Sequence, residues 1–153
     1  PLWRWLLRLV PSAALLPAPQ LAHPLPPETP AAGVERARVG LLTGCVNHVL
    51  FAATNAASAR VLARNGCRVV VPPAAGCCGA LHLHAGDREG ARARARAAIA
   101  AFPADLDAVV VNAAGCGAAM KEYGALLADD PLWAEPARAF AARVRDITEL
   151  LVE

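Results

Sequence analysis

Four of the five cysteines follow short apolar runs, and this placement constrains the fold more than any other feature of the sequence. The runs are rich in β-branched residues and occupy residues 39–43, 67–71 and 108–112. Such runs are typical of strands that are buried on both faces of a parallel sheet. The cysteines that follow them are Cys45, Cys77, Cys78 and Cys116. Because parallel strands end at one edge of a sheet, we expect these four thiols to lie close together.

The segments between and after these runs are predicted to be helices. Residues 87–102 consist mostly of alanine and arginine, which favour helices. Gly66 is expected to end the helix before the second run, in the left-handed conformation. Pro136 suits the first turn of a last helix, whose apolar positions would be Ala137, Phe140, Val144, Ile147 and Leu151. The alternation predicts a small three-layer α/β domain with a parallel sheet, a βαβαβ core, C-terminal helices, and cysteine loops at the carboxyl edge.

Residues 1–33 differ in composition from the rest of the 153-residue chain. Residues 11–33 contain seven prolines, which fix φ and remove hydrogen-bond donors, and this predicts an extended linker. The segment before it is predicted to be a short docking helix with its leucines on one face. Arg4 and Arg8 interrupt that segment, so it suits neither a signal peptide nor a membrane span. Because the chain begins with proline, we take it as a fragment of a larger subunit, with residues 34–153 as its compact domain.

The charge pattern argues against a nucleic-acid surface. The net charge is only +2, and no basic cluster alternates with aromatic residues. Arg88, Arg92 and Arg96 form a stripe along one predicted helix, which we interpret as a solvated face. The alternative is that this stripe docks onto a partner subunit. We therefore expect no nucleic-acid partner and no transmembrane segment.

Cysteine usage indicates a reducing compartment. Five cysteines cannot all form pairs, and the adjacent Cys77 and Cys78 could bridge each other only with strain. Thiols that act as ligands or redox groups fit this pattern better than a secreted disulfide framework does. We expect the protein in the cytoplasm, either free or peripheral on the inner face of the cytoplasmic membrane.

Each of the four clustered cysteines lies in a glycine-containing segment. Glycine lets the backbone come close to sulfur, so that amide N–H groups stabilise its negative charge, as they do around iron–sulfur clusters. A zinc ion held by four thiolates is an alternative, although zinc ligands usually come in closely spaced pairs. Spacing alone does not choose between iron and zinc. A third alternative is thiol–disulfide chemistry at Cys77 and Cys78. Cys67 begins a run instead of following one, and we interpret it as a small buried hydrophobic residue.

The segments around the cysteines resemble the cysteine-rich "CCG" domain. They are Thr43-Gly-Cys-Val46, Ala75-Gly-Cys-Cys-Gly-Ala80 and Ala114-Gly-Cys-Gly117, and the resemblance extends over residues 34–153. This domain occurs in heterodisulfide reductase, in anaerobic glycerol-3-phosphate dehydrogenase, and in lactate- and glycolate-oxidising complexes. The resemblance is closest to the iron–sulfur subunits of glycolate oxidase, which is also called glycolate dehydrogenase.

The resemblance implies an electron-transfer subunit of an oxidoreductase complex. It implies that an iron–sulfur cluster is bound by Cys45, Cys77, Cys78 and Cys116. Ala119 stands where the broader motif has a fifth cysteine, so we expect an ordinary [4Fe-4S] cluster, or else an incomplete site, and not the noncubane cluster of heterodisulfide reductase. FAD would belong to a partner subunit that oxidises glycolate, and electrons would pass through this chain towards quinone. The equivalent subunit of a lactate or glycerol-3-phosphate dehydrogenase complex is the alternative within the family.

The resemblance also implies partners and leaves the chain without a catalytic residue of its own. A ferredoxin-like domain and a second CCG domain would belong to the intact chain, and flavin-containing and other subunits would bind it. The sequence has no G-x-G-x-x-G loop and no evident general base. We interpret His82 and His84 as loop or surface residues; the alternative is that one of them ligates or moves a proton. Outside the family, a zinc-stabilised assembly module that transfers no electrons is the competing hypothesis.

Overall fold

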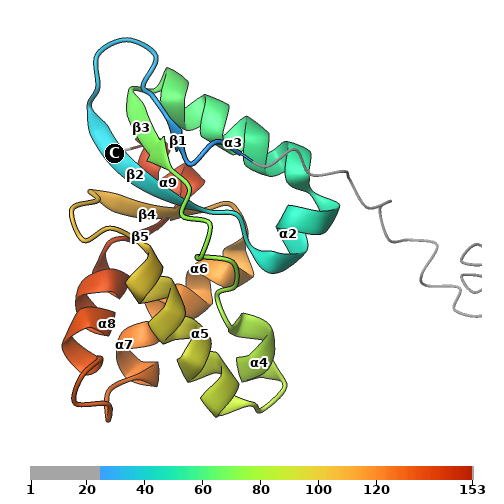
Figure 1. Cartoon of the computed structure of the whole chain (residues 1–153), viewed down its shortest axis with the longest axis vertical. Helices are drawn as coiled ribbons and strands as arrows, with labels where there is room; N and C mark the ends of the chain where they lie inside the picture. Colours follow the sequence, from blue (N-terminus) through green and yellow to red (C-terminus); the bar gives the residue numbers. More distant parts are fainter. Residues whose placement is uncertain (1–24, 153) are drawn as a thin grey trace, which may run out of the picture.

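The computed structural model of the chain describes residues 25–152. The predicted docking helix and most of the predicted linker lie outside the described residues. The described part contains a five-stranded sheet with the strand order β1-β3-β2-β4-β5 (Figure 1). The strands are β1 (Glu28–Thr29), β2 (Ala37–Leu42), β3 (Cys67–Val70), β4 (Ala108–Val111) and β5 (Val144–Asp146). Strands β3, β2, β4 and β5 are parallel to one another and β1 is antiparallel to β3, so the predicted α/β class is confirmed.

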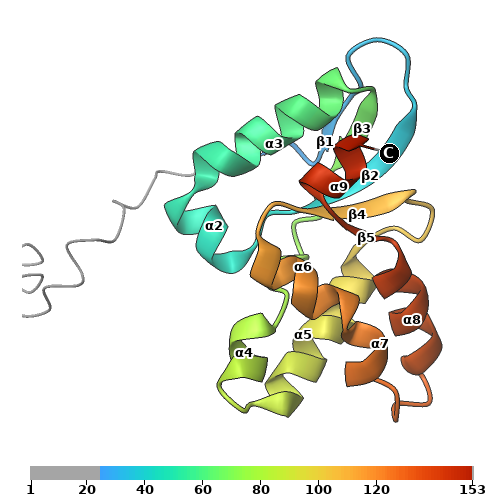
Figure 2. The same ribbon diagram turned by 180° about the vertical axis from the view of Figure 1, so that it is seen from behind.

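Helices cover both faces of the sheet (Figures 1 and 2). One face packs against α3 (Ala52–Arg64) and α9 (Ile147–Val152). The opposite face packs against α5 (Arg88–Ala101), α6 (Ala114–Lys121), α7 (Tyr123–Leu126) and α8 (Ala134–Ala142). Two short helices, α2 (Cys45–Leu50) and α4 (Ala80–His84), lie beyond the carboxyl ends of the strands. Among the described residues, no helix is long and apolar enough to cross a membrane.

The central strands are buried on both faces, as their apolar sequences predict. Val39 and Leu41 belong to the core beneath α3, whereas Leu42 belongs to the core beneath α5 and α8. Val109 belongs to the core beneath α5 and α8, and Val110 belongs to the core beneath α3. This alternation follows from the period of two in a strand, and burial of both sets of side chains supplies most of the stabilisation of the sheet. The predicted left-handed helix end is also present, because Gly66 follows α3 with a φ of 82°.

The predicted single last helix is wrong. The chain ends α8 at Ala142, forms strand β5, and then begins α9 at Ile147. Val144 lies in β5, opposite Val109 of β4, and is completely buried. The positions of Phe140, Val144 and Ile147 mimic a helical face, but β-branched Val144 gains burial and backbone hydrogen bonds at the edge of β4 that a surface helix would not give it.

The interpretation of the arginine stripe as a solvated face is also wrong. The Arg92 side chain is only 10% exposed, and its guanidinium contacts the carboxylates of Asp129 and Asp130. Arg96 forms an ion pair of 3.0 Å with Asp130. Of the three arginines in the stripe, only Arg88 is solvent-exposed. Two of the three arginines therefore connect α5 to the turn between α7 and α8, because a buried guanidinium requires acidic partners.

The end of the predicted linker contributes to the sheet. Glu28 and Thr29 form strand β1, which lies opposite Val70 and Val69 of β3. The Arg68 side chain forms ion pairs with Glu28 and with Glu35, at 2.9 Å and 2.7 Å. The prediction of an extended, proline-rich segment did not include this strand, because two paired residues leave no periodic pattern in the sequence.

Candidate functional site

Three loops bring the four predicted cysteines to the carboxyl edge of the sheet. Cys45 is the first residue of α2, after the short turn that follows β2. Cys77 and Cys78 lie in the loop between β3 and α4, and Cys116 lies in the first turn of α6, after β4. The sulfur atoms of Cys45 and Cys77 are 3.7 Å apart, and the side chain of Cys116 is hydrogen-bonded to that of Cys78. The prediction that these loops converge is therefore confirmed.

Cys67 does not belong to this site. It begins strand β3, is 7% exposed, and lies in the core beneath α3 together with Leu62 and Val69. Burial raises the pKa of its thiol. Its place in the core agrees with the interpretation of Cys67 as a small hydrophobic residue, and it makes this cysteine a natural control for experiments on the other four.

Glycines allow the cysteine loops to turn and to pack closely. Gly44 precedes Cys45 with a φ of 67°, and Gly79 follows Cys78 with a φ of 82°, a region that side chains disfavour. A Cβ atom on Gly79 would also lie 3.1 Å from the carbonyl oxygen of Ala91 in α5. The narrow spacing between the loop of Cys77 and Cys78 and helix α5 therefore requires glycine at this position.

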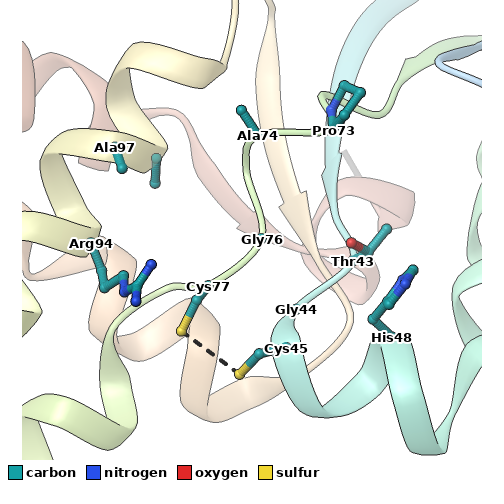
Figure 3. Close-up of a pocket in the computed structure, with 11 residues that line it drawn as sticks. Thr43, Gly44, Cys45, His48, Pro73, Ala74, Gly76, Cys77, Arg94 and Ala97 are labelled. Atoms are coloured by element: carbon teal, nitrogen blue, oxygen red, sulfur yellow. Dashed lines mark hydrogen bonds between the residues drawn. The ribbon is translucent and has the colours of Figure 1, made fainter.

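Two cavities are lined by cysteines of the site. The larger one, of about 350 Å³, lies between α2, α5 and the loop before α4, and its floor includes Cys45 and Cys77 (Figure 3). Arg94 extends from α5 on one side, His48 lies in α2 on the other, and none of the described residues that line this cavity is acidic. The smaller one, of about 210 Å³, is lined by all four cysteines of the site and mostly by apolar atoms. The four thiols thus share one compartment, and two of them also face a second, positively charged one.

Cys78 and Cys116 share a proton unequally. The hydrogen bond from the side chain of Cys116, together with backbone amides of Ala80 and Cys78, lowers the pKa of Cys78 to about 6. The same bond, with burial, raises the pKa of Cys116. We conclude that Cys78 is the thiolate of this pair and Cys116 its proton donor, because two adjacent buried charges would repel each other.

Backbone groups and a buried tyrosine support the loop of Cys77 and Cys78. The amide of Gly79 donates a hydrogen bond of 3.5 Å to the sulfur of Cys77, which is the type of contact predicted from the glycine-rich sequence. The hydroxyl of Tyr123 donates to the carbonyl oxygen of Cys78 at 2.7 Å. Burial, with the nearby thiols, raises the pKa of Tyr123, so its hydroxyl keeps its proton and remains a donor.

The two histidines singled out in the sequence occupy different surroundings. His82 forms a 2.9 Å contact with Asp87, which caps the N-terminus of α5, and so has a structural partner. His84 lines the smaller cavity together with the four cysteines, and its charge contributes to the lowered pKa of Cys78. Sequence reasoning passed over Arg94 and His48, which line the larger cavity. Arg94 lies two residues from both Arg92 and Arg96, which pair with the turn after α7, and this offset was the available sign that it faces another direction.

The donor set fits an iron–sulfur cluster. Within residues 25–152, no three His, Cys, Asp or Glu side chains are grouped so that they could hold a single metal ion. The four thiols instead form two pairs around a common cavity. Thiolates from separate loops, with amide N–H groups directed at sulfur, are the ligands that iron–sulfur clusters use.

Comparison with known proteins agrees with the resemblance of the cysteine segments. Residues 39–121 match the family model of the cysteine-rich domain CCG. The chain is 45% identical over 125 residues to the probable glycolate oxidase iron-sulfur subunit of Bacillus subtilis strain 168, covering 81% of this chain and 28% of that protein. It is 42% identical over 145 residues to the glycolate oxidase iron-sulfur subunit of Escherichia coli strain K12, covering 92% of this chain and 34% of that protein.

A second group of relatives is more distant. The chain is 33% identical over 114 residues to lactate utilization protein A of Shouchella clausii strain KSM-K16, covering 74% of this chain and 47% of that protein. The chain therefore spans about a third or less of the glycolate-related proteins and about half of the lactate-related one. No solved structure matches the chain significantly.

Proposed function

The chain belongs to the family of cysteine-rich CCG domains, and we propose that it is the cluster-binding part of an iron–sulfur subunit in a 2-hydroxy-acid dehydrogenase complex. The observation that carries this proposal is the compartment lined by Cys45, Cys77, Cys78 and Cys116. Both groups of relatives support the class of complex through their names, glycolate oxidase iron-sulfur subunit and lactate utilization protein A.

The proposed role is electron relay. Oxidation of a 2-hydroxy acid to the 2-oxo acid releases two electrons and two protons, and a flavin bound by a partner subunit would take up the hydride. A cluster in this chain, of the [4Fe-4S] type, would accept and release single electrons on the way to quinone. The substrate would thus be chosen in the partner, and this chain would need no general base of its own.

The residues of this chain prepare the thiols for that role. The bond between Cys116 and Cys78 favours one thiolate in advance, so less proton release is needed when iron binds. The amide of Gly79 stabilises negative charge on Cys77. The smaller cavity around the sulfurs has a mostly apolar wall, which includes Val46 and Leu81.

Glycolate is the proposed substrate of the complex, and lactate is the alternative. The higher identities belong to the glycolate-related proteins, at 45% and 42%, against 33% for the lactate-related one. We propose a cytoplasmic location, with the complex able to lie against the inner face of the membrane, where quinone would be reached. The ferredoxin-like and second CCG domains of the intact chain, and the flavin subunit, are the proposed partners.

An EPR experiment on the anaerobically purified natural complex tests the proposal. Glycolate should reduce a cluster whose signal disappears in the double variant Cys77→Ala, Cys78→Ala and persists in Cys67→Ala, which removes a cysteine outside the site. Reduction by lactate and not glycolate would assign the complex to the alternative substrate. A wild-type signal that is the same in the double variant would exclude this chain from the relay.

A further inference from the structure

Three asparagines and a serine form a hydrogen-bonded network beside the carboxyl ends of β2 and β4. Asn112 is at its centre: its side-chain amide donates to the oxygens of Asn55 and Ser58, each at 2.9 Å. Asn112 accepts a hydrogen bond of 3.0 Å from the side-chain amide of Asn47. The amide of Asn55 then donates to the carbonyl oxygen of Thr43 at 2.9 Å. Of these four side chains, only Asn47 also lines the smaller cavity with the cysteines.

The network joins two cysteine loops that lie far apart in the sequence. Thr43 and Asn47 flank Cys45, with Thr43 in the turn after β2 and Asn47 in α2, and Asn112 directly follows β4, shortly before Cys116. Asn55 and Ser58 come from α3 and lie between the two loops. Strands β2 and β4 are neighbours at the point where the strand order of the sheet reverses, which is where open α/β sheets place their ligands.

Burial makes this network specific. Asn55 is only 2% exposed and Ser58 only 6% exposed. A buried amide that loses its partner retains the full cost of its desolvation, so these side chains strongly favour the one arrangement in which every bond forms. In that arrangement the side-chain oxygen of Asn112 accepts one hydrogen bond and its side-chain NH₂ group donates two. No apolar or acidic side chain of similar size can reproduce this pattern.

Core packing alone would not hold the loop of Cys45. Helix α2, which begins with Cys45, contains no buried residue, and Gly44 before it provides no side-chain cap. The side chain of Asn47 is the part of α2 that reaches the network. The position of Cys45 relative to Cys116 therefore depends on polar bonds, in contrast to Cys78, which is itself 4% exposed and packed in the core.

We propose that Asn112 and Asn55 are positioning residues for the cysteine site: they set the distance between the loops of Cys45 and Cys116 and so hold the ligands of the cluster in register. The inference rests on the proposed function in so far as those cysteines bind a cluster. The geometric part, that the network fixes the two loops, does not require the cluster, and it can be tested separately. Residues that orient ligands typically change metal affinity by about 10- to 100-fold when they are replaced.

The first test compares Asn112→Ala with a matched control in the natural full-length protein. The control is Asn65→Ala, at the other end of α3, where the exposed Asn65 side chain donates to the carbonyl oxygen of Val61 at 2.8 Å. The measurement is the rate at which the visible absorbance of the cluster is lost to a chelator under anaerobic conditions. Asn112→Ala should lose the cluster about 10- to 100-fold faster than wild type, and Asn65→Ala at the wild-type rate. Equal rates for Asn112→Ala and Asn65→Ala would overturn the positioning role.

The second test uses metal-free protein and hydrogen exchange, so it is independent of iron. Asn112→Ala should speed amide exchange in residues 43–48 and 113–117 while exchange in β3 and α5 stays at its wild-type rate. Uniformly faster exchange would mean that the network stabilises the whole domain and positions nothing in particular, and unchanged exchange would also overturn the inference. If wild type binds no iron, the proposed function fails, but this exchange pattern still supports or overturns the network's effect on the loops.

Discussion

The two cysteine pairs of the site differ in how strongly the fold prepares them. Cys78 is buried at 4% exposure, accepts a hydrogen bond from Cys116, and has its carbonyl oxygen held by Tyr123. Cys45 is exposed at the start of a helix without buried residues, and its sulfur lies 3.7 Å from that of Cys77 beside an open cavity. One pair is therefore fixed by the core, and the other lies where electrons or partners could reach the site.

This contrast predicts unequal effects of removing single ligands. Cys78→Ala should lower the iron content of the purified protein by roughly tenfold or more, because the core-held ligand determines how the cluster is seated. Cys45→Ala should lower it less than Cys78→Ala does, since an exposed ligand position can be taken by water. Iron and acid-labile sulfide assays on both variants check this, and a greater loss in Cys45→Ala would reverse the proposed order of the two pairs.

Loss of the Tyr123 hydroxyl should destabilise the protein through the loop of Cys78. Tyr123→Phe leaves the carbonyl oxygen of Cys78 without its 2.7 Å donor in a buried setting. Such an unpaired group costs about 1–3 kcal/mol, so the free energy of unfolding in denaturant should fall by that amount. Arg138→Gln, which breaks an exposed ion pair with Glu135, serves as the control and should change it by less than about 1 kcal/mol. An unchanged unfolding midpoint in Tyr123→Phe would show that this bond does not support the loop.

The buried pair should also titrate in a characteristic way in metal-free protein. Thiolate absorbance should reveal one group with a pKa of about 6, and replacement of its donor in Cys116→Ala should move that titration upwards. Because the pKa of Cys78 is lowered from 9.0, its contribution to folding stability is lost as pH falls through about 6 and increases between 6 and 9. The raised pKa of Cys116 makes stability decline again above 9. A thiolate that appears only near 9 in wild type would contradict the unequal sharing of the proton.

The smallest expected effect concerns the more exposed pair, Cys45 and Cys77. Arg94 lines the cavity at Cys77, so it should attract anionic reagents to the sulfurs there. Arg94→Gln should slow alkylation by iodoacetate relative to neutral iodoacetamide by about twofold, the size expected for one exposed charge. Arg60→Gln, an exposed arginine of α3 outside both cavities, should leave the ratio unchanged. Mass spectrometry of the modified cysteines measures this ratio, and an unaltered ratio in Arg94→Gln would mean that the cavity has no useful positive potential.

The sequence was most informative where hydrophobic pattern and topology act together. The runs at residues 39–43, 67–71 and 108–112 indicated buried parallel strands, and β2, β3 and β4 occupy nearly those positions. Once the strands are parallel, their following loops must share one edge, so the meeting of four thiols required no knowledge of side-chain packing. The family resemblance rested on the same loops.

Other features depended on contacts that a single sequence does not reveal. Val144 continues a helical spacing, and only the free edge of β4 makes it a strand residue. Arg92 looks like part of an exposed stripe until the turn with Asp129 folds back against α5. Asn55 and Ser58 offered a usable sign, since small polar residues on the same face as buried Leu62 need polar partners inside the fold. Their partner, Asn112, could be found only from the three-dimensional structure.

Metal stoichiometry is the decisive measurement for the site as a whole. Iron, zinc and acid-labile sulfide should be counted in the anaerobically purified natural protein, and again after alanine replaces Cys45, Cys77, Cys78 and Cys116 together, with Cys67→Ala as the control. We expect the fourfold variant to lack about four irons and four sulfides that wild type and the control contain. A difference of one zinc and no iron, or no difference at all, would contradict an iron–sulfur cluster at the carboxyl edge of this sheet.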